Sequence, residues 1–365
     1  MKIIFFLASL SQPRCLKRIK SLYEAGYEVE VYGYSRGFYD INTLPSTIPT
    51  HNWGIVDSGN KYVSRFLNNR KKIKQVIERQ NRENVLYYAF GFDLAFWLSL
   101  YKRKHFIYES SDLIYTYFRS SILISFFRNI DKWIIKHSFR TIFTSEGFSL
   151  YLFGKQIPSN IIIQPNRVSP YLKNIERRIL KKSTDKIVFS YVGAFRYPDT
   201  VFRFARVIGE KYPRHQFFFY GDSRLTYLAK QLSFQYPNIK YFGKFRSPED
   251  LEAIYETIDI VVACYDANTI NERIAEPNKL YESICFCKPI VVSKGTFLSE
   301  QVKKLGVGYS INAREDSSIC HFIDGLSNHE LNSISEKELS IDSSMYIDSI
   351  AVSYTHLTLP TTERV

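Results

Sequence analysis

Two series of short apolar segments, each alternating with longer amphipathic segments, restrict the fold of this 365-residue chain more than any other feature. Between the first two apolar segments, Leu16, Ile19 and Leu22 recur at helical spacing, Pro13 suits the helix start and Gly26 suits its stop. Continuous apolar runs between helices are typical of strands buried on both faces of a parallel sheet. The first series predicts strands over residues 3–9, 29–34, 85–90, 106–111, 141–146 and 161–166.

The second series begins after a polar and basic stretch that breaks the alternation. It predicts strands over residues 187–193, 216–222, 239–244, 258–265, 290–293 and 308–311. We therefore expect an α/β fold of two Rossmann-like, doubly wound parallel-sheet domains that face each other across a cleft. The expected ranges are 1–170 for the first domain, 171–186 for a linker and 187–350 for the second domain.

The last residues continue neither series. The stretch VSYTHLTLPT (352–361) reads like translated sequencing-adapter DNA, so we interpret residues 351–365 as a non-native tail. A natural disordered tail is the alternative interpretation. Fold reasoning accordingly ends near residue 350.

The net charge indicates which binding partners the protein favours, and the cysteine content indicates its cellular compartment. The formal net charge of +13 favours anionic partners, namely nucleic acid, anionic lipid head groups or phosphorylated small molecules. Five cysteines without a C-x-x-C pair indicate neither a disulfide framework nor a zinc site, and suit a reducing compartment. The apolar start is short for a signal peptide, and no run approaches the roughly 18 apolar residues of a membrane span. We expect a cytoplasmic protein, with peripheral contact at the inner face of the plasma membrane as a further hypothesis.

The segment EPNKLYESICFCKPIVVS (276–293) carries the strongest chemical signal. Pro277 suits the first turn of a helix, where the amides of the next three residues, through Leu280, would be free to bind a phosphate. Lys279 adds a charge, and Glu282 lies one turn further on the same side, where it could accept hydrogen bonds from ribose hydroxyls. The same spacing also fits a simple i,i+3 ion pair, and spacing alone does not decide between the two.

Two further loops follow predicted strands of the second domain. In YVGAFRYP (191–198), Gly193 would let the backbone approach a ligand and Arg196 could grip phosphate with its forked donors. In FYGDSR (219–224), Gly221 and Asp222 occupy the equivalent place. A plain turn with a surface arginine is the alternative interpretation of the first loop. The chain lacks G-x-G-x-x-G and G-x-x-x-x-G-K-[ST], which disfavours dinucleotide oxidoreductases and P-loop NTPases.

Together these segments resemble a known family. The series VGAF, FYGDS, NIKYFGKF, DLEAIYETIDIVVACY and EPNKLYESICFCKPIVVS is similar, in order, to the nucleotide-sugar domain of retaining, family four GT-B glycosyltransferases. The first half resembles the family more loosely, in SQPRCLKRIKSLYEAGYEVEVYGY, YESSDL and QPNRV. The resemblance implies a hexosyltransferase that moves a sugar from a nucleotide-sugar donor to a glycan or lipid-linked glycan acceptor, with retained configuration and without a metal ion or other cofactor. A role in capsular polysaccharide or O-antigen synthesis is an association with the family.

The resemblance also implies roles for individual residues. Catalysis would involve Arg196 and Lys279 at the diphosphate and Asp112 on the acceptor side. Donor binding would involve Gly193, Ala194, Gly221, Asp222, Asn271, Glu272, Arg273, Glu276, Pro277, Asn278, Leu280 and Glu282, and no residue is expected to bind metal. The family's E-x7-E pattern is broken because position 274 is Ile274, so Glu272 or Glu276 would have to replace the first glutamate. The family's histidine near Ser111 is also missing, and SLSQPR replaces its glycine-rich loop.

Residues 121–140 indicate whether the enzyme could meet a lipid-linked acceptor at a membrane surface. SILISFFRNIDKWIIKHSFR mixes Ile, Phe and Trp with basic side chains, and such a helix could rest on anionic lipid or simply pack on the sheet.

Two functions other than glycosyl transfer remain as alternatives. A nucleotide-sugar 2-epimerase would use the same fold on donor alone, and a basic RNA- or lipid-binding protein would lack catalysis. No RNA-binding aromatic motif occurs among the strands, so we do not expect a nucleic-acid partner.

Overall fold

The computed structural model describes residues 1–35, 44–56, 62–80, 85–179 and 186–348. These form two compact units, Met1–Gln164 and Pro165–Asp348. The division falls six residues before the predicted end of the first domain. The 3-10 helix η2 (Pro170–Asn174) and the neighbouring residues predicted as linker therefore belong to the second unit. Residues 180–185 of that linker and the predicted tail 351–365 lie outside the described residues.

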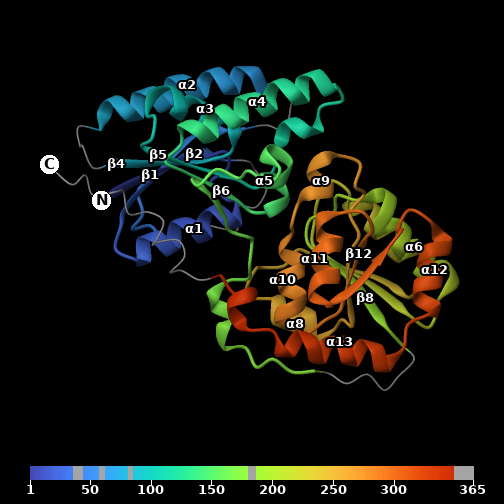
Figure 1. Ribbon diagram of the computed structural model, residues 1–365. Coiled ribbons are helices and arrows are strands. Elements are labelled where there is room, and N and C mark those ends of the chain that lie inside the picture. Colours follow the sequence, from blue (N-terminus) through green and yellow to red (C-terminus); the bar gives the residue numbers. More distant parts are fainter. Residues whose placement is uncertain (36–43, 57–61, 81–84, 180–185, 349–365) are drawn as a thin grey trace. The chain divides into compact units, whose positions relative to one another are not determined.

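The first unit is a parallel sheet with helices between its strands (Figure 1). Its described strands follow the order β3–β2–β1–β4–β5–β6–β7. Their bounds are β1 Lys2–Leu7, β2 Glu28–Ser35, β3 Thr50–Ile55, β4 Val85–Phe90, β5 Phe106–Ser110, β6 Arg140–Phe143 and β7 Ile161–Ile163. The helices are α1 Pro13–Glu24, α2 Tyr62–Arg79, α3 Phe92–Tyr101, η1 Ile114–Tyr117, α4 Ser121–His137 and α5 Glu146–Phe153.

The second unit repeats this architecture with the described strands in the order β10–β9–β8–β11–β12–β13, all parallel. The strands are β8 Val188–Val192, β9 Gln216–Tyr220, β10 Ile239–Gly243, β11 Ile260–Ala263, β12 Ile290–Ser293 and β13 Gly308–Ile311. The helices are η3 Pro198–Phe202, α6 Arg203–Lys211, α7 Thr226–Gln235, α8 Leu251–Glu256, α9 Ile270–Ile274, α10 Asn278–Cys285, α11 Phe297–Leu305, α12 Asp316–Asp324, α13 Asn328–Ser340 and η4 Ser343–Met345.

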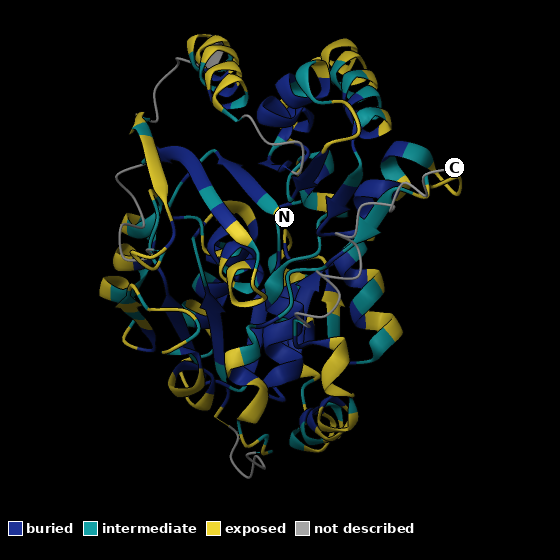
Figure 2. Cartoon of the chain, turned by 90° about the vertical axis from the view of Figure 1, so that its left-hand side faces the viewer, coloured by how far each residue is buried: buried dark blue, intermediate teal, exposed yellow. Residues whose placement is uncertain are grey.

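The apolar strands form the cores, as their composition predicts. Strands β4, β5, β11 and β12 are buried along their whole length, and the exposed residues lie mainly on helices and loops (Figure 2). Each of the twelve predicted strands is present. The sequence missed β3, because this edge strand is largely exposed and carries no apolar run.

The strand order gives one candidate ligand-binding position in each unit. In each sheet the chain first winds outward in one direction and then returns to wind in the other. The reversal lies between β1 and β4 in the first unit and between β8 and β11 in the second. Ligands of doubly wound sheets bind at such switch points, beyond the carboxyl ends of the strands. No helix among the described residues is both long and apolar enough to cross a membrane.

Candidate functional site

Three neighbouring strands of the second unit end in glycines with positive φ. Gly193 follows β8 (φ 137°), Gly221 follows β9 (φ 134°) and Gly243 ends β10 (φ 85°). The Gly193 amide donates to the Tyr220 carbonyl at 2.8 Å, and the Gly221 amide donates to the Gly243 carbonyl at 2.7 Å. A Cβ on Gly221 would lie 2.0 Å from the Gly193 carbonyl oxygen. The glycines thus allow the backbones of these strand ends to approach each other without side chains between them.

Helix α10 begins beside this glycine cluster. Pro277 is its N-cap and has no side-chain capping bond, and the first turn holds no acidic residue. A Cβ on Gly193 would lie only 3.5 Å from the Lys279 ammonium nitrogen, so the structure brings these two predicted residues together. The Leu280 amide donates to the Pro277 carbonyl at 3.3 Å, which occupies one of the three amides that the sequence predicted to be free.

The carboxylate of Glu282 is the most constrained group of the site. Its Oε2 accepts hydrogen bonds from Lys279 Nζ at 3.0 Å and from the Tyr255 hydroxyl at 2.7 Å. Its Oε1 accepts one from the Asn278 side-chain amide. Glu282 and Lys279 are only 4% and 6% exposed. The ion pair that spacing allowed is therefore present, and it is a buried pair with additional hydrogen bonds rather than surface decoration.

Arg196 lies near the same group of side chains. It is exposed in the loop after β8. Burial raises the pKa of the Tyr191 and Tyr265 hydroxyls above their usual range; the charge of Arg196 opposes this rise at both tyrosines and the charge of Glu282 adds to it. Both charges therefore act on the same two phenols. Ala194, the residue after Gly193, accepts a hydrogen bond from the Tyr191 hydroxyl through its carbonyl at 2.9 Å.

Asp222 lies at the end of β9, next to Gly221. Its carboxylate accepts a hydrogen bond from the Thr226 hydroxyl and pairs with Lys244 at 3.4 Å. The Thr226 bond is the main cause that lowers the pKa of Asp222, and Lys244 adds to it. A charged carboxylate thus borders the glycine cluster on the side of α7.

The residues predicted to contact the donor sugar form hydrogen bonds with nearby residues or are buried. Glu272 and Thr269 form a capping box at the start of α9, with the Thr269 amide donating to the Glu272 carboxylate at 3.0 Å. Arg273 donates to the Ala267 carbonyl at 3.2 Å, and Asn271 is buried. The Tyr281 hydroxyl donates to Glu276. Neither glutamate that could replace the missing member of E-x7-E belongs, within the described residues, to a cluster of potential metal ligands.

Asp112 belongs to the first unit and follows β5. The Ser111 hydroxyl donates to its carboxylate at 3.4 Å, and the Ser110 hydroxyl donates to its carbonyl at 3.2 Å. Strand β5 is one strand away from the switch point between β1 and β4. Asp112 therefore lies at the carboxyl edge of its own sheet.

Sequence reasoning missed a buried charged cluster in the first unit. Glu109 on β5 is fully buried and pairs with Arg14 at 3.4 Å and Arg18 at 3.3 Å, both from α1. The Tyr88 hydroxyl on β4 donates to the same carboxylate. The arginines lie at i and i+4 on α1, but nothing in the sequence pairs them with a glutamate inside an apolar strand.

Sequence reasoning also missed Tyr255 and Gly243 in the second unit. Tyr255 has the spacing of a core residue on α8, and its ring is indeed fully buried, but its hydroxyl reaches Glu282. Gly243 ends the segment IKYFG, and a glycine after an apolar strand is the signal that could have identified it.

Comparison with known proteins places this site in a family. Residues 173–338 match the family model described as glycosyl transferases group 1. This match spans most of the second unit and assigns the chain to the glycosyltransferases. No curated protein sequence matches the glycosyltransferase significantly.

Solved structures agree on the GT-B fold. A sucrose-phosphate synthase from Thermosynechococcus elongatus is 12% identical with a TM-score of 0.74, covering 98% of each chain. Anabaena HepE in complex with UDP-glucose is 15% identical with a TM-score of 0.70, covering 97% of each chain. WaaG, a glycosyltransferase involved in lipopolysaccharide biosynthesis, is 12% identical with a TM-score of 0.65, covering 92% of this chain and 94% of its own. The predicted GT-B fold and enzyme class are confirmed.

Proposed function

We propose that the glycosyltransferase moves a hexose from a nucleoside diphosphate sugar to a glycan or lipid-linked glycan acceptor. The observation that supports this most is the placement of Lys279 at the uncapped start of α10, beside Gly193, with Glu282 one turn further on. The helix start and the ammonium suit a diphosphate, and the carboxylate suits a ribose. HepE, which has the same fold, was solved with UDP and with UDP-glucose.

The same residues suggest how the transfer proceeds. As the bond between the sugar's anomeric carbon and the diphosphate breaks, negative charge grows on the departing phosphate. Lys279, the start of α10 and Arg196 stabilise that charge electrostatically, without a bound metal ion. Lys279, whose ammonium pairs with the Glu282 carboxylate at 3.0 Å, turns toward the phosphates in this proposal. Retention of the anomeric configuration and an acceptor-side role for Asp112 complete the proposal.

Calorimetric titration with UDP, GDP, ADP and CMP tests the donor site. We expect one nucleotide to bind, and we expect Lys279→Ala and Glu282→Ala to abolish its binding. Lys303→Ala is the matched control, because Lys303 is an exposed lysine on α11, outside the proposed site. Nucleotide binding that survives both site variants would refute the assignment.

A product assay then separates a transferase from the 2-epimerase. The enzyme is incubated with the nucleotide-sugar alone and with added glycan. A transferase releases the nucleotide only when an acceptor is present, whereas an epimerase converts the sugar of the donor alone. Conversion without acceptor would overturn the proposed reaction.

We further propose that the enzyme acts at an anionic lipid surface, on the inner face of the plasma membrane, in the synthesis of a surface polysaccharide such as capsule or O-antigen. Six large apolar side chains within residues 114–126 are 38% to 79% exposed: Ile114, Tyr117, Phe118, Ile122, Leu123 and Phe126. We call them the α4 patch. Exposed Arg119 lies among them, and the chain carries a net charge of +13. Apolar side chains beside basic ones are the chemistry of an interfacial membrane contact.

Sedimentation with vesicles tests the α4 patch. We expect binding to phosphatidylglycerol-containing vesicles and little binding to pure phosphatidylcholine. Ile122→Ser with Phe126→Ser should abolish it, while Phe234→Ser should not, although Phe234 on α7 is 95% exposed. Equal loss in both variants, or no vesicle binding by the unaltered enzyme, would refute the membrane proposal.

A further inference from the structure

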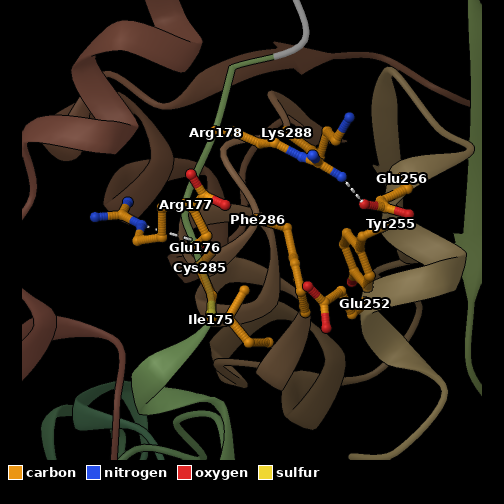
Figure 3. A pocket seen from close by; sticks show the side chains of 10 residues that line it. All are labelled: Ile175, Glu176, Arg177, Arg178, Glu252, Tyr255, Glu256, Cys285, Phe286 and Lys288. Carbon is orange, nitrogen blue, oxygen red and sulfur yellow. Dashed lines mark hydrogen bonds and ion pairs between the residues drawn. The ribbon is translucent and has the colours of Figure 1, made fainter.

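Tyr255 links the candidate donor site to the opposite end of α10. Its hydroxyl donates to Glu282 Oε2 at 2.7 Å. Its ring stacks on Phe286, the C-cap of α10, with a centroid distance of 4.5 Å and an interplanar angle of 18°. Figure 3 shows the two rings beside each other, where they line a pocket together with Ile175 and Glu252. The ring of Tyr255 is thus packed against α10 about one turn beyond Glu282.

The hydrogen bond from Tyr255 differs from the other restraints on Glu282. Asn278 and Lys279 both belong to α10, four and three residues before Glu282. Both also stand at the start of the helix, where the proposed diphosphate binds. Tyr255 comes from α8 and is fully buried. If the diphosphate draws Lys279 away, Tyr255 still holds one oxygen of the carboxylate.

We propose that Tyr255 is a positioning residue that orients the Glu282 carboxylate toward the ribose hydroxyls of the donor. The inference rests on the proposed function and concerns the ribose half of the same site. Tyr255 keeps its proton for this role, because burial, and after it the charge of Glu282, raises the pKa of the phenol well above its usual range. The other lone pairs of the carboxylate are then left to the ligand and to Asn278.

The test compares three probes on Tyr255→Phe, which removes the hydroxyl and keeps the ring on Phe286. UDP, 2′-deoxy-UDP and inorganic pyrophosphate are titrated by calorimetry, with GDP and ADP in parallel. We expect UDP to bind about 10-fold more weakly, which is the loss typical of one hydrogen bond to a charged group. The preference for UDP over 2′-deoxy-UDP should fall toward one, and pyrophosphate affinity should not change.

Two comparisons separate positioning from general damage. Tyr212→Phe also removes a phenol bond to a carboxylate, to Asp324 at 2.9 Å, and should leave all three affinities unchanged. In a Glu282→Gln background, Tyr255→Phe should have no further effect on UDP binding. Should Tyr255→Phe not fold, Phe286→Leu loosens the ring while keeping the hydroxyl, and a smaller loss of ribose preference is expected.

The outcomes also separate this inference from the proposed function. An unchanged preference for UDP over 2′-deoxy-UDP, or an effect of Tyr255→Phe that persists with Gln at position 282, overturns the role of Tyr255 alone. Failure of UDP, GDP and ADP to bind the unaltered enzyme would instead overturn the donor site itself.

Discussion

Replacing Lys279 with Met would leave the Glu282 carboxylate buried without its cation. Removing one partner of a buried ion pair typically destabilises a protein by about 3–5 kcal/mol, because the other charge stays buried and uncompensated. Glu282 would keep its hydrogen bonds from Tyr255 and Asn278. We therefore expect the lower end, about 3 kcal/mol. For a unit of this size, that corresponds to a fall in Tm of roughly 6–12 °C.

The double variant Lys279→Met with Glu282→Gln makes the prediction sharper. It removes both charges while keeping the shape of both side chains, and such replacements of buried pairs are often neutral. We expect the double variant to recover most of the lost Tm but none of the nucleotide binding. Comparison of the single and the double variant would thus distinguish the effect of the ion pair on stability from its effect on nucleotide binding.

Differential scanning calorimetry and titration with UDP provide the two measurements. Lys303→Met is the control for loss of an exposed lysine and should shift Tm by less than about 1 °C. The reasoning is refuted if Lys279→Met is as stable as the unaltered enzyme, or if the double variant is less stable than the single one. Either result would mean that the pair is not buried in solution as the structure has it.

Three further predictions concern the scaffold. Gly221→Ala should unfold the second unit or abolish nucleotide binding, since its Cβ would meet the Gly193 carbonyl oxygen at 2.0 Å; thermal unfolding and titration would measure this. Burial raises the pKa of Asp131 on α4 to about 7, so the folded first unit keeps a proton that the unfolded chain loses above about pH 4. Its stability should therefore fall by up to about 4 kcal/mol between pH 4 and 7, and Asp131→Asn should remove that slope in urea unfolding. Arg177→Met should destabilise the second unit by about 4 kcal/mol or more in the same assay, because the guanidinium donates to several main-chain carbonyls at the ends of α10 and α13.

Each of these predictions can fail clearly. Gly26→Ala is the control for Gly221→Ala, because Gly26 also has a positive φ (85°) but no atom within 4 Å of its added Cβ. Equal effects of the two would attribute the loss to backbone strain and not to the close approach. A pH slope that persists in Asp131→Asn, or an Arg177→Met variant as stable as the unaltered enzyme, would contradict the burial or the hydrogen bonds described here.

The sequence by itself determined the buried strands of this glycosyltransferase and the candidate site residues at the start of α10. Apolar runs between amphipathic segments predicted every buried strand, since a strand covered on both faces needs apolar side chains throughout. Pro277, Lys279 and Glu282 were identified because they lie at the start of the same helix, where spacing along the chain sets distance in space. Gly193 and Gly221 were identified because a glycine after a strand lets the backbone approach a ligand closely; their positive φ and their close approach to each other came from the structure.

Only the tertiary structure decided which partners these residues have. Tyr255 looked like an ordinary core residue until folding placed its hydroxyl on Glu282, 27 positions away. Arg177 lay in a segment predicted as a linker, yet it binds carbonyls more than 100 positions further along. Glu272 was predicted as a ligand for the donor sugar, and only the structure shows that it completes a helix cap. Periodicity tells whether a side chain faces inward, but the element that it meets there depends on strand order and helix packing, and no local pattern records those.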